Sequence, residues 1–257
     1  MDILTTTSNG ILTIEFNRPE RKNAITGAMY TTMADALRVA ESDNTVRAIL
    51  IVGKPEIFTA GNDLDDFLNN VGEGAMTEDR PVFQFMRALE GSTKPVVAAV
   101  AGLAVGIGTT LLMHCDLVYA ADNAKFSMPF TQLGLCPEFA SSLLVTQAAG
   151  YTRAAEKLML GEAFSAQEAF EMGIVAKVLP AADLLAFAQG QAAKLVKLPA
   201  ASIRTTKMLM KRSRAALVAD TIKAENERFS AMLTGAEAKE AFTAFFEKRK
   251  PDFSKFD

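Results

Sequence analysis

The stretch KPVVAAVAGLAVGIGTTLLMHCDLVYAADNAKFSMPF, residues 94–130, decides the fold class of this chain. It predicts a buried strand, PVVAAVA (95–101), then a glycine-rich loop and the apolar helical segment TTLLMH (109–114). Two further strands are expected at DLVYAAD (116–122) and AKFSM (124–128). Apolar strands that alternate with helical segments are typical of a mostly parallel sheet covered by helices. The stretch therefore predicts an α/β fold.

The segments before this stretch extend the same pattern. ILTTTSNGILTIEFN (3–17) predicts a β-hairpin with its turn at SNG, and a threonine cap predicts a helix over 26–41. VRAILIVG (46–53) predicts another buried strand, and residues 80–90 another helix. Residues 70–78 are small, polar and glycine-containing, which indicates a mobile loop.

The pattern changes to helices after Pro137. One short extended piece, IVAKVLP (174–180), interrupts them, and residues 181–257 predict three or four amphipathic helices. The expected organisation is an α/β core over 1–195 and a helical C-terminal region over 196–257. That region is expected to pack on the core or on a partner subunit.

Composition and charge exclude several classes of function. The 257 residues are 49% hydrophobic and 22% charged, which suits a soluble globular protein with a sizeable core. The net charge of −3 gives no basic excess for binding nucleic acid. The N-terminal MDILTTTSNG does not resemble a secretory signal, and no apolar run reaches the roughly 18 residues of a membrane span. We therefore expect a cytoplasmic protein without a membrane partner.

The single histidine and the two cysteines limit the available chemistry. His114 lies in LLMHCDLVYA among core-like residues, so we expect it to be structural. Cys115 and Cys136 do not suggest a disulfide framework. No group of histidines, cysteines and acids has the spacing of zinc ligands, so no metal is expected.

Two glycine-containing loops resemble each other in context. FTAGNDL (58–64) and AGLAVGIG (101–108) each follow an expected strand and precede an expected helix. Backbone N–H groups from two such loops can bind one oxygen and form an oxyanion hole. A dinucleotide site is the weaker alternative, since Gly102, Gly106 and Gly108 do not have G-x-G-x-x-G spacing. Plain tight turns are the structural alternative.

Glu138 is the lone acid in LGLCPEFASS (133–142). It is interpreted either as a titratable group for chemistry or as an acid in the first turn of a helix that starts at Pro137. A helix N-terminus would lower the pKa of this carboxyl group. Apolar neighbours such as Phe130 and Phe139 would raise it, and the sequence alone does not decide between the two effects.

Five motifs in collinear order resemble the enoyl-CoA hydratase/isomerase (crotonase) superfamily. They are FNRPERKNAI (16–25), FTAGNDLDDF (58–67), the stretch at 94–130, LGLCPEFASS (133–142) and AAEKLMLGEAFSAQEAFEMGIVAKV (154–178). The resemblance implies a spiral of ββα units in the core, a helical C-terminal region used in assembly, and a homotrimer or a hexamer made of two trimers. It also implies an acyl-CoA thioester as the substrate, with coenzyme A as part of that substrate and no separate cofactor.

The resemblance also implies the residues of the site. The thioester oxygen would accept hydrogen bonds from the backbone N–H groups of Asn62 and Ile107. Lys22 would contact phosphates of coenzyme A, or it is simply a solvated loop lysine. The other implied substrate-binding residues are Ala24, Ala60, Gly61, Asp63, Leu64 and Gly106.

Two positions separate the reactions of this superfamily. Hydratases carry two glutamates, and the matching positions here are Thr110 and Phe130. Hydration needs a base and an acid, which neither side chain supplies. Glu138 falls where the peroxisomal-type Δ3,Δ2-enoyl-CoA isomerases and their bacterial relatives place a single catalytic glutamate. The resemblance thus implies an isomerase acting on unsaturated fatty acyl chains by a 1,3-proton shift. A hydratase or other acyl-CoA lyase, and a non-catalytic RNA-binding or assembly protein, are the alternatives.

Other polar residues are interpreted structurally. Asp63 is expected to begin a helix or to orient its loop, with Asp65 and Asp66 in solvent, and Asp116 is expected to be structural. The run KMLMKRSR (207–214) is interpreted as the solvent-exposed face of a helix, with contact to nucleotide phosphates across a subunit boundary as the alternative. Met208, Leu209 and Ala215 are expected to face inward from that helix. Helix 80–90 and segment 70–78 are expected to line the acyl pocket. Subunit contacts are expected for Phe242, Phe245 and Phe246.

Overall fold

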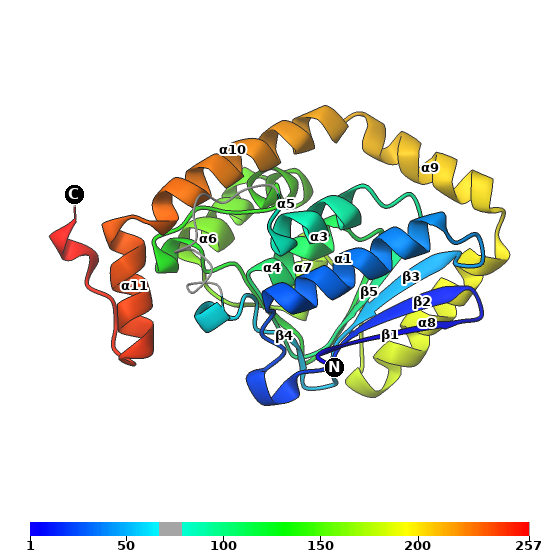
Figure 1. The fold of residues 1–257 in the computed structure, drawn as a ribbon, viewed down its shortest axis with the longest axis horizontal. Coiled ribbons are helices and arrows are strands. Elements are labelled where there is room, and N and C mark those ends of the chain that lie inside the picture. Colours follow the sequence, from blue (N-terminus) through cyan, green and yellow to red (C-terminus); the bar gives the residue numbers. More distant parts are fainter. Residues whose placement is uncertain (67–78, 257) are drawn as a thin grey trace.

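The computed structural model describes residues 1–66 and 79–256, in which the strands form two sheets (Figure 1). The larger sheet has, in spatial order, β1 (Ile3–Ser8), β2 (Ile11–Phe16), β3 (Ala48–Val52), β5 (Val96–Val100), β7 (Leu117–Ala121) and β10 (Lys177–Leu179). The smaller sheet has β4 (Ile57–Thr59), β6 (Leu103–Val105), β8 (Lys125–Ser127) and β9 (Phe164–Ser165). The loop expected at 70–78 lies outside the described residues.

The pairing of the strands confirms the α/β prediction. β1 and β2 form the expected antiparallel hairpin, and every other pairing in the larger sheet is parallel. In the smaller sheet β4, β6 and β8 are parallel, while β9 joins antiparallel. Parallel strands end at one edge of a sheet, so the segments that follow β4, β6 and β8 lie close together.

Helices cover both faces of the larger sheet because its central strands are apolar on both faces. Along β3, Ile49 and Ile51 pack into the main core with α1 (Gly27–Ser42) and α3 (Pro81–Glu90). Ala48 and Leu50 point the other way and pack against α8 (Ala181–Lys197). Successive side chains of a strand alternate between its faces, which accounts for this division. The hydroxyl oxygen of Thr26 accepts from the Met29 N–H and caps α1, as predicted.

Short helices connect the smaller sheet to the rest of the molecule. They are α4 (Ile107–Thr110), the 3-10 turns Leu111–His114 and Thr131–Leu133, α5 (Ser141–Ala149), α6 (Tyr151–Leu160) and α7 (Ala166–Glu171). α4 lies directly against β4, since a Cβ atom on Gly108 would stand 2.5 Å from Cγ2 of Thr59. Only glycine permits that approach.

The C-terminal region consists of α9 (Ala200–Arg212), α10 (Ala215–Leu233) and α11 (Ala236–Phe246). Figure 1 shows α10 passing over α5 and leading to α11 at one end of the molecule. The predicted orientation of the basic run on α9 is wrong. Lys207 is buried and its Nζ donates to Oδ2 of Asp116 at 2.7 Å, whereas Met208 and Leu209 are 54% and 55% exposed. The ion pair draws the polar face inward, and Asp116 has the structural role expected for it.

In the described part of the chain, none of the helices combines the length and the apolar character that crossing a bilayer requires.

Candidate active site

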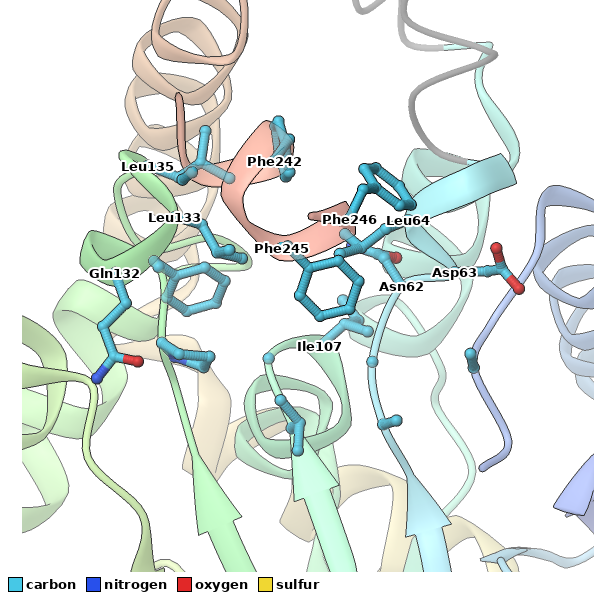
Figure 2. A pocket seen from close by; sticks show the side chains of 18 of the residues that line it. Asn62, Asp63, Leu64, Ile107, Gln132, Leu133, Leu135, Phe242, Phe245 and Phe246 are labelled. Atoms are coloured by element: carbon cyan, nitrogen blue, oxygen red, sulfur yellow. The ribbon is translucent and has the colours of Figure 1, made fainter. Parts of the chain in front are cut away.

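A cavity of about 890 Å³ opens where β4 and β6 end, facing segment 129–138 and α11. Figure 2 shows Asn62 and Ile107 on one side of it and Leu133, Leu135 and Phe242 on another. Eleven of the twelve residues predicted for the site or for a hydratase glutamate position line this cavity, among them Lys22, Ala24, Ala60, Gly61, Asn62, Asp63, Leu64, Gly106, Phe130 and Glu138. Ile107 lines it as well, whereas Thr110 does not line it.

The loop after β4 is held by backbone hydrogen bonds to the segment that precedes α1. The Ala60 N–H donates to the Lys22 carbonyl at 3.0 Å, and the Ile25 N–H donates to the Gly61 carbonyl at 2.8 Å. The Asp63 N–H donates back to the Ile25 carbonyl at 3.0 Å. The Gly61 carbonyl and the Asp63 N–H, on the two sides of residue 62, are thus fixed, which orients the Asn62 N–H between them.

The two predicted oxyanion donors face the same cavity. In the described residues, neither the Asn62 N–H nor the Ile107 N–H donates to another group of the chain. Their loops touch, because a Cβ atom on Gly61 would stand 2.7 Å from the Val105 carbonyl oxygen. Gly106 has φ +56, and a Cβ there would meet nothing within 4 Å. The arrangement can therefore present two N–H groups to one oxygen atom.

The acids of the first loop are engaged by the protein itself. Oδ2 of Asp63 accepts from Arg18 at 2.6 Å, and its Oδ1 accepts from the Asp66 N–H at 3.1 Å, so Asp63 orients the loop as expected. Burial opposes ionisation of Asp63, but these hydrogen bonds hold its pKa below the usual range. Asp65 is exposed, as predicted. Asp66 is not in free solvent, since it accepts from the first N–H of α1 at 2.8 Å.

Glu138 differs from these acids. Glu138 is only 5% exposed and lines the cavity, and its Oε1 has no hydrogen-bond partner among the described residues. It precedes α5, which begins at Ser141, so the expectation that it lies in the first helical turn is wrong. Burial, and secondarily the negative charge of Glu225, raise its pKa to about 8. Desolvation therefore outweighs any effect of the nearby helix end.

Backbone strain marks the turn that carries Glu138. Phe139 and Ala140 have φ values of +57 and +55, a left-handed conformation that costs energy in residues with a side chain. Nε2 of His114 donates to the Phe139 carbonyl at 2.8 Å, and the two rings stack at 3.7 Å. Burial lowers the pKa of His114 to about 3, so this histidine stays neutral. Its predicted structural role is confirmed.

The positions that would carry hydratase glutamates contain no carboxyl group. Thr110 is fully buried in α4, and its Oγ1 has no partner among the described residues. Phe130 is buried and contributes an apolar surface to the cavity. Glu138 is thus the one carboxyl group in the described lining that no cation of the chain engages, since Asp63 and Asp65 pair with arginines.

The apolar side of the cavity comes largely from α11, for which the sequence predicted no part in the site. Phe242, Phe245 and Phe246 of α11 line the cavity (Figure 2), and the subunit contacts expected for them stay a prediction. The expectation for helix 80–90 is wrong for the described lining, to which α3 contributes no residue. The basic residues of the lining are Arg21, Lys22, Arg249 and Lys250. Among the described residues, His, Cys, Asp and Glu side chains nowhere gather in threes as metal ligands would.

Comparison with known proteins agrees with this geometry. Residues 6–255 match the family described as enoyl-CoA hydratase/isomerase. The chain belongs to this family. A solved structure of a family member, the enoyl-CoA hydratase/isomerase from Pseudoalteromonas atlantica T6c, superposes with a TM-score of 0.93 at 37% identity. The match covers 99% of this chain and 100% of that one, so the crotonase-like fold is shown.

Relatives within the family carry both isomerase and hydratase names. Mouse peroxisomal enoyl-CoA delta isomerase 3 is 40% identical over 182 residues, covering 70% of this chain and 57% of that protein. A probable enoyl-CoA hydratase of Mycobacterium leprae is 34% identical over 245 residues, covering 95% and 94%. The chain thus spans little more than half of the isomerase relative and nearly all of the hydratase relative.

Sequence reasoning missed three residues that shape the site of this family member. The Tyr30 hydroxyl donates to Oδ1 of Asn62 at 2.5 Å, and the Asn23 amide donates to the carbonyl oxygens of Ile57 and Phe58. Glu225 bonds the Glu138 turn from α10. Tyr30 and Glu225 occupy apolar helix faces, where their periodicity is that of core residues. Asn23 lies in the FNRPERKNAI motif, so of these three residues only Asn23 could have been found from the sequence.

Proposed function

We propose that the protein is a Δ3,Δ2-enoyl-CoA isomerase, which moves the double bond of a 3-enoyl-CoA to the trans-2 position. One observation carries the proposal. Glu138 is a buried carboxyl group with an unpartnered oxygen in the cavity, and the two hydratase positions hold Thr110 and Phe130. A single acid suffices for this reaction because one proton is removed and one is returned.

The proposed mechanism needs no co-reactant. The Glu138 carboxylate takes a proton from C2, and the electrons of that C–H bond form an enolate conjugated with the 3,4 double bond. The same carboxyl group then returns a proton to C4, the 2,3 double bond forms, and the 3,4 double bond is lost. A pKa of about 8 suits a group that must both accept and release a proton near neutral pH.

The thioester oxygen carries the negative charge between the two proton transfers. In the proposed complex it accepts hydrogen bonds from the N–H groups of Asn62 and Ile107, which fixed backbone already orients. Such preorganised donors are typically worth about 10²–10³-fold in turnover each. Lys22, with Arg21, is proposed to contact phosphates of coenzyme A, which enters as part of the substrate and not as a separate cofactor.

Hydration of 2-enoyl-CoA is the second candidate, favoured by the extent of the match to the hydratase relative. Hydration requires water activation on one side and protonation of carbon on the other. Glu138 could serve one of these steps, but the described lining offers no second carboxyl group without a cation. The cavity therefore supports isomerisation better.

The C-terminal region is proposed to contribute to assembly, as a homotrimer or a hexamer of two trimers. Its helix α9 exposes the apolar side chains Met208, Leu209 and Met210. Light scattering coupled to size-exclusion chromatography would measure the mass. A monomer at micromolar concentration would contradict this part of the proposal.

An ultraviolet assay tests the proposed reaction. Purified protein is given trans-3-hexenoyl-CoA, and in parallel crotonyl-CoA, because conjugation with the thioester raises absorbance and hydration removes it. We expect the rise with wild type, and a loss of about 10³-fold in Glu138→Gln, which removes the base. Glu227→Gln is the matched control, since Glu227 is an exposed glutamate of α10.

The contrary outcomes are distinct. Consumption of crotonyl-CoA without any rise on trans-3-hexenoyl-CoA would establish hydratase chemistry instead. No reaction with either thioester, together with tight and salt-sensitive RNA binding, would favour the non-catalytic alternative.

A further inference from the structure

A second glutamate lies behind the Glu138 turn and comes from a distant part of the chain. Oε2 of Glu225, on α10, accepts from the Ala140 N–H at 2.5 Å. Its Oε1 accepts from the Ser142 N–H at 3.0 Å and from the Ser142 hydroxyl. The backbone carbonyl of the same residue lies 3.8 Å from Sγ of Cys136. Contacts from one residue of α10 thus bracket Glu138 on both sides along the chain.

These bonds do more than cap α5. A helix start needs acceptors for its first N–H groups, and a serine or aspartate next to it in sequence usually supplies them. Here the residue before α5 is Ala140, which has no side-chain acceptor, and the cap comes from 85 residues further along the chain. The acceptor is also a buried carboxyl group, which costs free energy unless it is well bonded. Capping alone therefore does not explain why a buried carboxylate from a distant helix occupies this position.

The left-handed backbone supplies that reason. Ala140 has φ +55 and ψ +21, and Phe139 before it has φ +57. Two consecutive residues in this region persist only when their surroundings hold them. Glu225 holds the turn at Ala140 and Ser142, and His114 holds it at Phe139. Together they determine where the Glu138 carboxyl group points.

The charges of the two glutamates are coupled. Burial raises the pKa of Glu225, but its hydrogen bonds from Ser142 and Ala140 favour the ionised form. Both oxygens of Glu225 accept hydrogen bonds, as a carboxylate does, whereas Oε1 of Glu138 has no donor and burial raises the pKa of Glu138 to about 8. The negative charge of Glu225 adds to the effect of burial on Glu138.

The other titratable groups near the turn do not replace Glu225 in this role. Tyr30 of α1 stays protonated because burial, and then the charge of Glu138, raise its pKa. Burial raises the pKa of Cys136 to about 11, and His114 is neutral. Arg228, also on α10, lies near Cys136 and is exposed. Glu225 is the remaining group of these that carries a buried charge.

We propose that Glu225 is a positioning residue for Glu138: its carboxylate fixes the turn 138–142 and places a negative charge behind the catalytic carboxyl group. The inference that Glu225 positions Glu138 rests on the proposed function in one respect, namely that Glu138 is the catalytic residue. The position and the proton affinity of Glu138 are properties of the free protein. They can be measured without a substrate.

The test follows the protonation of Glu138 by infrared difference spectroscopy as pH changes. The band of the protonated carboxyl group is assigned to Glu138 by its loss in Glu138→Gln. We expect its midpoint in Glu225→Gln to fall by about one pH unit relative to wild type. The rising limb of kcat/KM on trans-3-hexenoyl-CoA should shift in the same direction, because the base acts when ionised. Glu227→Gln is the control and should titrate with wild type.

A second variant separates charge from geometry. Glu225→Asp keeps the charge but is one methylene shorter, so it does not reach both amides. We expect its infrared midpoint to stay close to that of wild type while kcat falls roughly 10-fold, since misplacement of a catalytic group slows the chemical step. This variant also covers the case in which Glu225→Gln does not fold.

The outcomes that overturn the inference differ from those that overturn the proposed function. If Glu225→Gln titrates together with wild type, Glu225 does not act on Glu138. An unchanged kcat in Glu225→Asp would reduce Glu225 to a helix cap. If the infrared midpoint shifts as expected but trans-3-hexenoyl-CoA is not converted, the positioning role holds and the isomerase assignment fails.

Discussion

The two sides of the cavity are built in different ways. The polar side consists of loops that follow β4 and β6, fixed by backbone hydrogen bonds and by close glycine contacts. The opposite side consists of the Glu138 turn and α11, fixed by side chains of Glu225 and His114 and by aromatic packing. In the proposed function, the first side binds the thioester oxygen with main-chain atoms, and the second supplies the acid and the apolar surface.

The two sides of the cavity therefore differ in which substitutions they tolerate. Main-chain donors keep their identity under most substitutions, so the polar side depends on backbone conformation at a few glycines. The acid side depends on individual side chains from helices far apart in sequence. Reactions on one scaffold can therefore change by substitution on the acid side while the oxyanion loops stay the same.

Beyond the assay of Glu138→Gln, the largest effect is expected from Gly61→Ala on the polar side. Gly61 has φ +87, and the added Cβ would lie 2.7 Å from the Val105 carbonyl oxygen, so the two loops must separate. Loss of one oxyanion donor should lower kcat about 10²–10³-fold. Gly190→Ala is the control, because a Cβ there meets nothing within 4 Å. Equal kcat for Gly61→Ala and wild type would mean that these loops do not hold the thioester oxygen.

The second prediction concerns the stability of Glu138→Gln on the acid side. The raised pKa of Glu138 means that ionisation opposes folding, so wild type loses stability as pH rises from about 4.5 to about 8. The stability of the variant relative to wild type should therefore grow by up to about 1.4 kcal/mol per pH unit in that window.

Urea unfolding at several pH values measures this difference. The unfolding free energy of Glu138→Gln relative to wild type should be roughly 3 kcal/mol greater at pH 7 than at pH 4.5. Glu227→Gln, at an exposed site, should stay within about 0.5 kcal/mol of wild type. A difference between Glu138→Gln and wild type that does not depend on pH would show that Glu138 is not destabilised by burial.

Removal of one α11 ring tests the apolar side by itself. Phe245→Ala should raise KM about 10-fold and leave kcat within about 3-fold, because the ring contributes contact area and no chemistry. Phe170→Ala, a half-exposed ring of α7, is the control. A fall in kcat with KM unchanged would instead give Phe245 a part in the chemical step.

The smallest effect is expected from Tyr30→Phe. The variant loses the hydrogen bond to Oδ1 of Asn62 and keeps the packing of the ring against Phe85. A cost of about 0.5–1.5 kcal/mol in unfolding free energy and a fall of a few-fold in kcat are expected. Tyr151→Phe is the control at an exposed tyrosine. A fall in kcat as large as that of Gly61→Ala would show that the polar side also depends on side chains.

The sequence was informative where local pattern determines structure. Glycines after apolar strands identified the loops around Asn62 and Ile107, and the continuous apolar run along 46–53 predicted β3 as a buried strand of the sheet. The resemblance to the family identified Glu138, which the residues alone left open between chemistry and a helix start. Its pKa could not be predicted, since it depends on which residues desolvate it.

Long-range packing accounts for the predictions that were wrong. Lys207 was expected in solvent, but its pairing with Asp116 turns α9 so that Met208 and Leu209 face outward. That α11 packs over the cavity of its own chain was not predicted either, and the subunit contact expected for Phe245 stays a prediction. Nothing local to these residues specifies such partners.

The position of α11 has a consequence for how the protein is made. The loops after β4 and β6 and the Glu138 turn all precede α11 in the chain, so synthesis completes them before their aromatic cover exists. A nascent chain that has reached only α10 exposes Phe130, Leu133 and Leu135 without Phe242 against them. During that interval the apolar side of the cavity is an exposed surface of the kind that promotes aggregation, until residues 236–246 have emerged and docked.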